Sequence, residues 1–275
     1  MSSPVGGSGS GTGSGSVSAS AGADAGSVAG AQAALPLAEA PLAAPLNALA
    51  IDTTSDVLSL ALLQRGLPAG ACFDAIGRRT TQEILPRIGA LLAAAGLEPG
   101  ALDVLVVARG PGSFTGTRIG LAVALTIAQV TGRPVVGVDT LALLAAQSEP
   151  APGRAFPVLL NCARDEVYHA RYRWEGAGLA RVSGIALTGI EALAPALAGQ
   201  AVRLRRFRPG LGTTAAQEAA FAALAPLPLR HPEPDGARLL AVGLGRWLAQ
   251  PGREWLRVEP IYLKSEAFRT WRAPP

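Results

Sequence analysis

RGPGSFTG, residues 109 to 116, connects a predicted buried strand, Asp103 to Ala108, to a predicted helix, Thr117 to Val130. The strand reads DVLVVA, a continuously apolar run typical of a strand covered on both faces. Glycines between a strand and a helix can present backbone N–H groups to an anion. The spacing G-x-G-x-x-x-G differs from the dinucleotide-binding pattern, and the loop lacks a Walker A lysine. A tight turn capped by Ser113 or Thr115 explains the same residues, and we favour it over phosphate binding.

The segment before this loop predicts a hairpin, a third strand and a helix. Apolar runs at Asn47 to Thr53 and Val57 to Leu63 flank a polar turn, which indicates a hairpin. Pro68 to Asp74 is the third candidate strand. From Thr80 to Ala95 apolar residues recur on one face of a predicted helix.

That helix carries its own start and stop signals. Thr80 and Glu83 fit a capping box, and Gly96 suits the end of the helix. Pro86 lies beyond the first turn, where it removes a hydrogen bond and predicts a bend.

The remainder of the chain repeats part of this pattern. A strand at Pro134 to Val138 precedes a helix that Asp139 or Thr140 caps. After a Pro/Gly break, PVLLNCARDEVYHARY has the same order of strand, polar turn and strand as ALAIDTTSDVLSLAL. This echo predicts two related lobes, at residues 46–150 and 151–275. In the second lobe we expect further elements at Ile185 to Gln200 and Val202 to Phe207, a helix at Asp235 to Gln250, and a strand near Pro260 to Lys264.

Composition places limits on the class of protein. Residues 1 to 45 are almost wholly Gly, Ser, Ala, Pro and Leu, which predicts a disordered tail without a secretory signal. Apolar runs stay below the roughly 18 residues that span a bilayer, so we expect no membrane contact. The two cysteines match no metal-binding spacing and are expected to be reduced thiols in a cytoplasmic protein. The excess of 24 basic over 20 acidic residues is too small to indicate nucleic-acid binding.

A few polar residues are candidates for chemistry. Asp52 and Thr53 end the first strand, where a carboxylate could face a metal-bound nucleotide or simply form a turn. The matching place in the second lobe is Asn161, a poorer cation ligand. His169 is expected to be a cross-strand residue rather than a catalytic base, and the two histidines cannot form a helical metal pair. The basic run Arg203 to Arg208 suits either a solvated strand edge, which we favour, or an RNA-facing patch.

Four motifs carry a family resemblance: AIDTTSDVLSLAL, EILPRIGALL, RGPGSFTGTRIGLAVA and RPVVGVDTLALLA. In this order they resemble the TsaB (YeaZ) family of the actin-like superfamily, and DEVYHARY and EPIYLK extend the resemblance. The resemblance implies an α/β, two-lobed actin-like (ASKHA, ribonuclease H-like) fold with mixed sheets flanked by helices. The family loop comprises Arg109, Gly110, Pro111, Gly112, Ser113, Phe114, Thr115 and Gly116.

The same resemblance implies a function. It is that of a pseudo-enzyme, a non-catalytic subunit that forms a heterodimer with TsaD. It would activate TsaD for threonylcarbamoyl transfer to N6 of the adenosine beside the anticodon of tRNA. We expect no catalytic residue, metal or cofactor of its own, with ATP and metal on partner proteins. TsaE is a further expected partner, tRNA is reached through the complex, and homodimer formation by the free protein stays open.

The family's partner surface is formed by the first two helices of the N-terminal lobe. Here it implies interface residues Glu83, Ile84, Ile88, Leu91, Arg118, Leu121 and Leu125. Burial within the lobe is the alternative for the apolar second helix. Asn161 and the Thr80-Thr81-Gln82 sequence depart from the family pattern and argue against a catalytic role. The alternative functions are a glycoprotease-like hydrolase, a small-molecule kinase of the actin-like fold, or an RNA binder that uses the arginine run.

Overall fold

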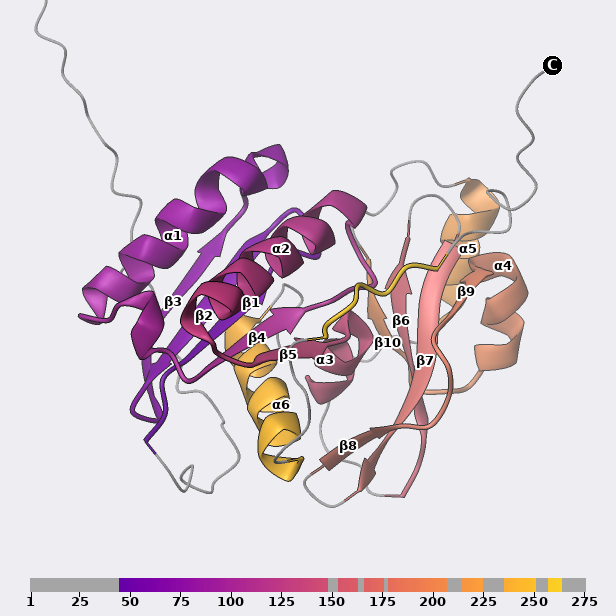
Figure 1. Ribbon diagram of the computed structural model, residues 1–275. Coiled ribbons are helices and arrows are strands. Elements are labelled where there is room, and N and C mark those ends of the chain that lie inside the picture. Colours follow the sequence, from indigo (N-terminus) through magenta and orange to yellow (C-terminus); the bar gives the residue numbers. More distant parts are fainter. Residues whose placement is uncertain are drawn as a thin grey trace, which may run out of the picture. The chain divides into compact units, whose positions relative to one another are not determined.

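The computed structural model describes residues 45–147, 153–162, 166–175, 178–206, 214–224, 235–250 and 257–263, which form two mixed β-sheets flanked by helices (Figure 1). The predicted tail lies outside these ranges except for residue 45. The first sheet has the order β3-β2-β1-β4-β5. Its strands are β1 (Ala48–Asp52), β2 (Leu58–Gln64), β3 (Leu67–Asp74), β4 (Val104–Ala108) and β5 (Val135–Val138). The predicted hairpin is confirmed, because β1 pairs antiparallel with β2 and parallel with β4.

Side chains of the first sheet alternate between two cores, because successive residues of a strand point to opposite faces. Leu49 and Ile51 of β1 pack on the face that is covered by α1 (Thr80–Ala94) and α2 (Phe114–Thr131). Ala48 and Ala50 belong to the core on the other face, with α3 (Thr140–Ala146) and α6 (Gly236–Ala249). Figure 1 shows α1 and α2 side by side, and the two helices contact each other.

The second sheet repeats the arrangement of the first. Its order is β10-β6-β7-β8, with β9 paired to β7. The strands are β6 (Phe156–Asn161), β7 (Glu166–Glu175), β8 (Gly178–Arg181), β9 (Ala186–Gly189) and β10 (Arg203–Arg205). β6 pairs antiparallel with β7 and parallel with β10, as β1 does with β2 and β4. Helices α4 (Ile190–Leu193) and α5 (Ala215–Ala223) and a 3-10 turn at Ala194–Leu197 contribute to the core on one face.

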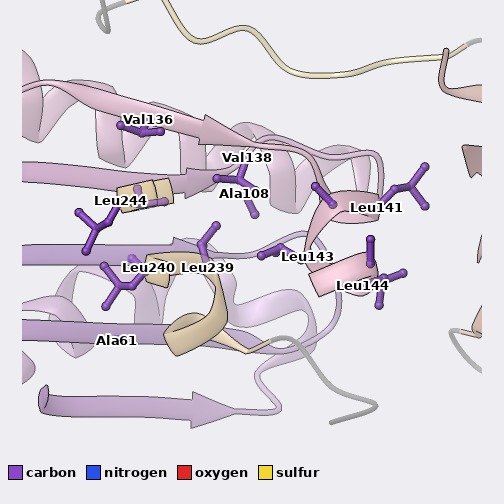
Figure 2. Close-up of a cluster of buried hydrophobic side chains, with 14 of the residues drawn as sticks. Ala61, Ala108, Val136, Val138, Leu141, Leu143, Leu144, Leu239, Leu240 and Leu244 are labelled. Atoms are coloured by element: carbon purple, nitrogen blue, oxygen red, sulfur yellow. The ribbon is translucent and has the colours of Figure 1, made fainter. Parts of the chain in front are cut away.

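One hydrophobic core contains side chains from both sheets. Figure 2 shows leucines of α3 and α6 in the cluster that also contains Val136 and Val138 of β5. Val158 of β6 and Tyr172 of β7 belong to the same cluster and are buried. Burial of apolar surface contributes about 25 cal/mol per Å², so this shared core is a principal contact between the sheets.

Two predicted helix starts change in the structure. The N-cap of α1 is Arg79 and makes no side-chain cap bond, so the predicted capping box is wrong. The hydroxyl of Thr80 instead donates to the carbonyl oxygen of Gly77 (2.9 Å). α2 begins at Phe114 rather than Thr117, because the Ser113 hydroxyl accepts a hydrogen bond from the Gly116 N–H. The cap by Ser113 is one of the two alternatives that the sequence allowed.

The C-terminal part of the chain differs most from expectation. We assigned the helix at Asp235 to Gln250 to the second lobe, but α6 packs on β1, β2, β4 and β5 of the first sheet. The strand predicted at Pro260 to Lys264 is also wrong, because the described residues there form no strand. Strand propensity alone cannot supply a neighbouring strand, and residues 257–263 bond to the glycine loop instead.

Among the described helices, α2 alone is long and apolar enough, by length and composition, to cross a membrane. It packs on β1, β4, β5 and α1, and 33% of its residues are buried. The core helix of a globular lobe passes the same test of length and composition. The expectation of no membrane contact stays a prediction.

Candidate functional site

The carboxyl end of β1 runs into a buried polar turn. Asp52, Thr53 and Thr54 are each at most 1% exposed. Oδ1 of Asp52 accepts hydrogen bonds from the N–H (2.8 Å) and the hydroxyl (2.7 Å) of Thr54. Oδ2 has no hydrogen-bond partner among the described residues. Burial raises the pKa of Asp52 despite the opposing effects of Thr54 and Arg205, so the interior favours the neutral carboxylic acid.

The glycine loop packs directly on this turn. The Thr53 hydroxyl donates to the carbonyl oxygen of Gly116 (2.7 Å), and the Ser113 N–H donates to the carbonyl oxygen of Thr54 (2.7 Å). The Thr117 N–H donates to the Ser113 carbonyl oxygen as α2 begins (2.9 Å). Backbone groups of Ser113 and Gly116 are therefore already hydrogen-bonded within the protein.

Close packing explains the glycine spacing. A Cβ added to Gly112 or Gly116 would overlap the carbonyl oxygen of Thr54 or Thr53, respectively. A Cβ on Gly120, one turn along α2, would overlap the Thr53 hydroxyl. Glycine is therefore required where the loop and α2 approach the backbone of the β1–β2 turn. These contacts account for the glycines without a bound anion.

The segment Arg257–Leu263 lies on the same loop. The Ile261 N–H donates to the carbonyl oxygen of Arg109 (2.8 Å), and the Arg109 guanidinium donates to the carbonyl oxygen of Glu259 (3.3 Å). Val258 contributes to the core of the first sheet, against Gly137. The chain from Arg257 to Leu263 is thus fixed to a loop about 150 residues earlier in the sequence.

This segment brings an aromatic ring to the beginning of α2. The rings of Phe114 and Tyr262 have centroids 5.0 Å apart at an interplanar angle of 44°. The guanidinium carbon of Arg118 lies 3.8 Å from the Phe114 centroid and 5.3 Å from that of Tyr262. We call these three residues the aromatic–arginine cluster. All three side chains are exposed.

The second sheet holds the counterpart of Asp52. Asn161 ends β6 as Asp52 ends β1, and it is 5% exposed. Its side-chain amide donates to the carbonyl oxygen of Cys162 (3.1 Å). Arg205 of β10 is also buried, and its charge acts on Asp52. The last residues of β1, β6 and β10 are thus a buried carboxyl group, a buried amide and a buried guanidinium: Asp52, Asn161 and Arg205.

Other candidate residues have structural explanations. Nε2 of His169 lies 2.9 Å from the Thr188 hydroxyl on the neighbouring strand β9, so the cross-strand prediction is confirmed. Burial lowers the pKa of His169.

Both cysteines are free thiols, and burial raises the pKa of Cys72 to about 12, which keeps it protonated at neutral pH. His231 lies outside the described residues. No group of three or more His, Cys, Asp or Glu side chains in the described ranges could hold a metal ion.

The arginine run lies partly on β10 and is only partly exposed to solvent. Arg205 is buried, and Arg206 forms an ion pair with Glu218 of α5 (2.6 Å). The Arg206 guanidinium also stacks on the Phe221 ring, 4.1 Å from its centroid. The predicted strand edge is confirmed, because β10 is the edge strand of the second sheet, but the edge is not solvated at Arg205, whose side chain points into the interior. Residues 207 and 208 lie outside the described ranges.

Comparisons with known proteins now identify the family. The family model described as "TsaD: tRNA N6-adenosine threonylcarbamoyltransferase" matches residues 74–224, more than half of the chain. The tRNA threonylcarbamoyladenosine biosynthesis protein TsaB of Escherichia coli K12 is 37% identical over 48% of this chain and 57% of its own length. The structure titled "YeaZ from Pseudomonas aeruginosa" is 27% identical, covers 79% of this chain and all of its own length, and has a TM-score of 0.61. This chain belongs to the TsaB (YeaZ) family.

Membership of the TsaB family confirms the expected actin-like α/β fold. An uncharacterized protein of Mycobacterium tuberculosis H37Rv is 31% identical over 78% of this chain and 90% of its own length. The matched region spans little more than half the length of the curated TsaB relatives: 57% of the Escherichia coli protein and 58% of the Bacillus subtilis protein.

The interface residues that the TsaB resemblance implied are divided by the structure. Four of the seven lie in the core of the first sheet and are at most 4% exposed: Ile84, Ile88, Leu91 and Leu121. Their side chains pack on their own sheet, because the inward stripe of an amphipathic helix faces the core. Glu83 and Leu125 are half-buried and Arg118 is exposed, so these three remain accessible.

Sequence reasoning missed two residues of the TsaB-like site, Arg205 and Tyr262. Arg205 was included in a surface run, and only its strand neighbour across the sheet shows that it points inward. Tyr262 belongs to the EPIYLK motif, which contributed to the family resemblance although the sequence did not show what the motif contacts. That motif was the one signal that could have directed attention to the aromatic–arginine cluster.

Proposed function

We propose that this chain is a non-catalytic subunit that binds a TsaD-type threonylcarbamoyltransferase and activates it. The reaction it supports is transfer of a threonylcarbamoyl group to N6 of the adenosine beside the anticodon of tRNA. The proposal is supported by family membership, since curated relatives are named tRNA threonylcarbamoyladenosine biosynthesis proteins. ATP and metal belong to the partner proteins, TsaE joins the complex, and the reaction takes place in the cytoplasm.

The observation that carries the proposal is the outer surface of α1 and α2. Leu85 of α1 is 58% exposed and Val130 of α2 is 82% exposed. Four further exposed positions on the two helices carry small residues: Gly89, Ala90, Ala93 and Ala122. We call this surface the α1–α2 face. Small side chains allow a second pair of helices to approach closely, and burial of this apolar surface would stabilise a complex.

Relatedness supports a TsaD-type protein as the partner. The TsaD family model covers residues 74–224, which include both helices of the α1–α2 face. A TsaD-type protein therefore has a related helix pair, and pairing of two related surfaces makes a near-symmetric heterodimer.

A non-catalytic role is supported by the β1 turn. Asp52 makes both of its hydrogen bonds to Thr54, and the loop covers the same turn. A fully buried carboxyl group presents no oxygen to solvent, so Asp52 is poorly placed to bind a metal-bound nucleotide.

Reconstitution tests the proposal. The TsaD-type and TsaE-type proteins of the same organism are incubated with tRNA and with the reagents that generate the threonylcarbamoyl donor. Modified adenosine is then measured in digested tRNA by mass spectrometry. We expect omission of this chain to abolish most of the product, and Ala122→Glu to weaken both partner binding and product formation by about tenfold or more.

The matched control is Ala219→Glu, the same substitution at an exposed position of α5. Glutamate in an exposed helix costs only about 0.5 kcal/mol relative to alanine, so both variants should fold. An unchanged yield of modified adenosine without this chain contradicts the proposal. Equal effects of the two variants contradict the assignment to the α1–α2 face. Leu121→Glu is unsuitable for this purpose, because Leu121 lies in the core.

A further inference from the structure

The aromatic–arginine cluster holds one guanidinium in a fixed orientation at the surface. Arg118 lies over the Phe114 ring, and its Nε donates a hydrogen bond to the Tyr262 hydroxyl (3.0 Å). Cation–π contacts of this kind contribute about 0.5 to 1 kcal/mol at exposed sites. A free arginine side chain loses rotamer entropy on binding, whereas this one is already ordered by two rings and a hydroxyl group.

The remaining donors of Arg118 point to a type of ligand. Within the described ranges, its two terminal amino groups make no hydrogen bond, whereas Nε is used by Tyr262. Two terminal amino groups side by side match the two oxygens of a carboxylate, and such a bidentate pair has both charge and directional hydrogen bonds.

Tyr262 reaches this position only because the segment Arg257–Leu263 is fixed elsewhere. The hydrogen bonds between Arg109 and the backbone of Glu259 and Ile261 hold the segment on the loop. Val258 adds an apolar anchor in the core of the first sheet. The C-terminal segment therefore completes a surface that begins on α2.

The cluster continues the α1–α2 face. Arg118 and Ala122 are four residues apart on α2, so both are on the same side of the helix, and both are exposed. α2 carries no charged residue besides Arg118, which suits a protein partner better than the phosphate backbone of a nucleic acid. Arginine and tyrosine are also the residue types that most often dominate the energy of protein interfaces.

We infer that Phe114, Arg118 and Tyr262 form a carboxylate-binding site for an acidic side chain of the TsaD-type partner, with Tyr262 supplied by the C-terminal segment. This inference rests on the proposed function, because it assigns a second anchor to the same complex. The site fixes the end of the interface next to the glycine loop, and the small residues of the α1–α2 face fill the remainder.

Binding measurements with the full-length chain and its TsaD-type partner test the site. Calorimetric Kd values are compared for the wild type, Arg118→Gln, Tyr262→Ala and Tyr262→Phe. We expect Arg118→Gln and Tyr262→Ala to weaken binding about tenfold or more, and Tyr262→Phe, which keeps the ring, to weaken it only a few-fold. Added salt should weaken wild-type binding more than binding by Arg118→Gln, because the charged pair is screened.

Arg181→Gln is the matched control, since Arg181 is an exposed arginine at the end of β8 in the second sheet. Its Kd should stay within about twofold of wild type. Thermal unfolding identifies any variant that fails to fold. Tyr262→Phe and Arg118→Gln change few packing contacts, so they keep the test decisive if Tyr262→Ala is unstable.

Each outcome separates this site from the broader proposal. If Ala122→Glu weakens partner binding while Arg118→Gln and Tyr262→Ala do not, the carboxylate site is wrong and the proposed function stands. If the wild type does not bind the TsaD-type protein, both are wrong. If Arg118→Gln and Tyr262→Ala reduce affinity for tRNA alone but leave the partner Kd unchanged, the ligand is a phosphate and the inference is overturned.

Discussion

Burial of Asp52 changes how readily its carboxyl group carries a charge. A carboxylate at the end of a strand can serve as a metal ligand where it is solvated and charged. Here the side chain is fully buried, and only one of its oxygens accepts hydrogen bonds. Burial outweighs the favourable effect of Arg205 and raises the pKa of Asp52. The residue therefore closes a turn through Thr54, and burial disfavours its charged form.

Asp52→Asn should make the protein more stable at neutral pH. A pKa that is raised in the folded state means that the folded protein binds the proton more tightly than the unfolded chain. Stability of the wild type therefore falls as pH rises from the unfolded pKa, near the ordinary aspartate value of 3.8, towards the raised folded pKa. Asparagine has no charge to desolvate and can still accept the Thr54 bonds. Urea denaturation at several pH values between about 4 and 8 measures the difference.

The advantage of Asp52→Asn should shrink as the pH approaches the lower limit of that series. The exposed Asp56→Asn variant is the control for loss of one negative charge. If Asp52→Asn is less stable than wild type at neutral pH, Asp52 is charged in the folded protein and its attraction to Arg205 dominates.

At the scale of elements, glycines decide how closely helix and sheet approach. Gly243 of α6 packs on β4, where an added Cβ would overlap the Val106 side chain. Two residues further along the same helix, a Cβ on Gly245 would meet nothing within 4 Å. The two positions have the same helical backbone but opposite environments.

Gly243→Ala should destabilise the protein by about 1 to 3 kcal/mol, because the extra methyl group overpacks the core between α6 and β4. Gly245→Ala should stabilise it by about 0.5 to 1 kcal/mol, because alanine is the better helix former in open space. Chemical denaturation of both variants and the wild type measures the two changes in the free energy of unfolding. Similar changes in the free energy of unfolding for both would contradict the close approach of α6 to the sheet.

At the scale of the whole molecule, the two sheets share one core and one buried polar node. The Tyr172 hydroxyl of β7 donates to Oδ1 of Asp139 (2.6 Å), the residue that caps α3. The Arg246 guanidinium of α6 reaches Oδ2 of the same carboxylate (3.5 Å). Burial and the neighbouring carboxylate raise the pKa of Tyr172, so its hydroxyl remains a donor throughout the physiological range.

Tyr172→Phe should lower the free energy of unfolding by about 1 to 3 kcal/mol, because it removes a buried hydrogen bond to a charged group. Tyr168→Phe is the matched control on the same strand, where the one hydrogen bond of the hydroxyl to a described residue is a 3.5 Å contact with the Cys162 thiol. Its effect should be about 0.5 kcal/mol or less. Equal losses for the two variants would show that the node with Asp139 adds nothing to the joining of the sheets.

The sequence by itself determined the elements and the family of this protein. Apolar periodicity located β1, β2, β4, α1 and α2 to within a few residues, because local hydrogen bonding and one-sided burial leave a periodic pattern. The four motifs placed the chain in the TsaB family, and the echo between its halves agrees with the matching strand orders of the two sheets.

Only the tertiary structure decided which side of each element is used. It placed α6 on the first sheet, turned Ile88 and Leu121 into the core, and brought Tyr262 to Arg118 across 144 residues. The RGPGSFTG loop likewise suited an anion or a turn until contacts with Thr53 and Thr54 explained its glycines. Periodicity describes a residue relative to its own helix or strand. Contacts between distant segments depend on packing of the whole chain, which no local pattern encodes.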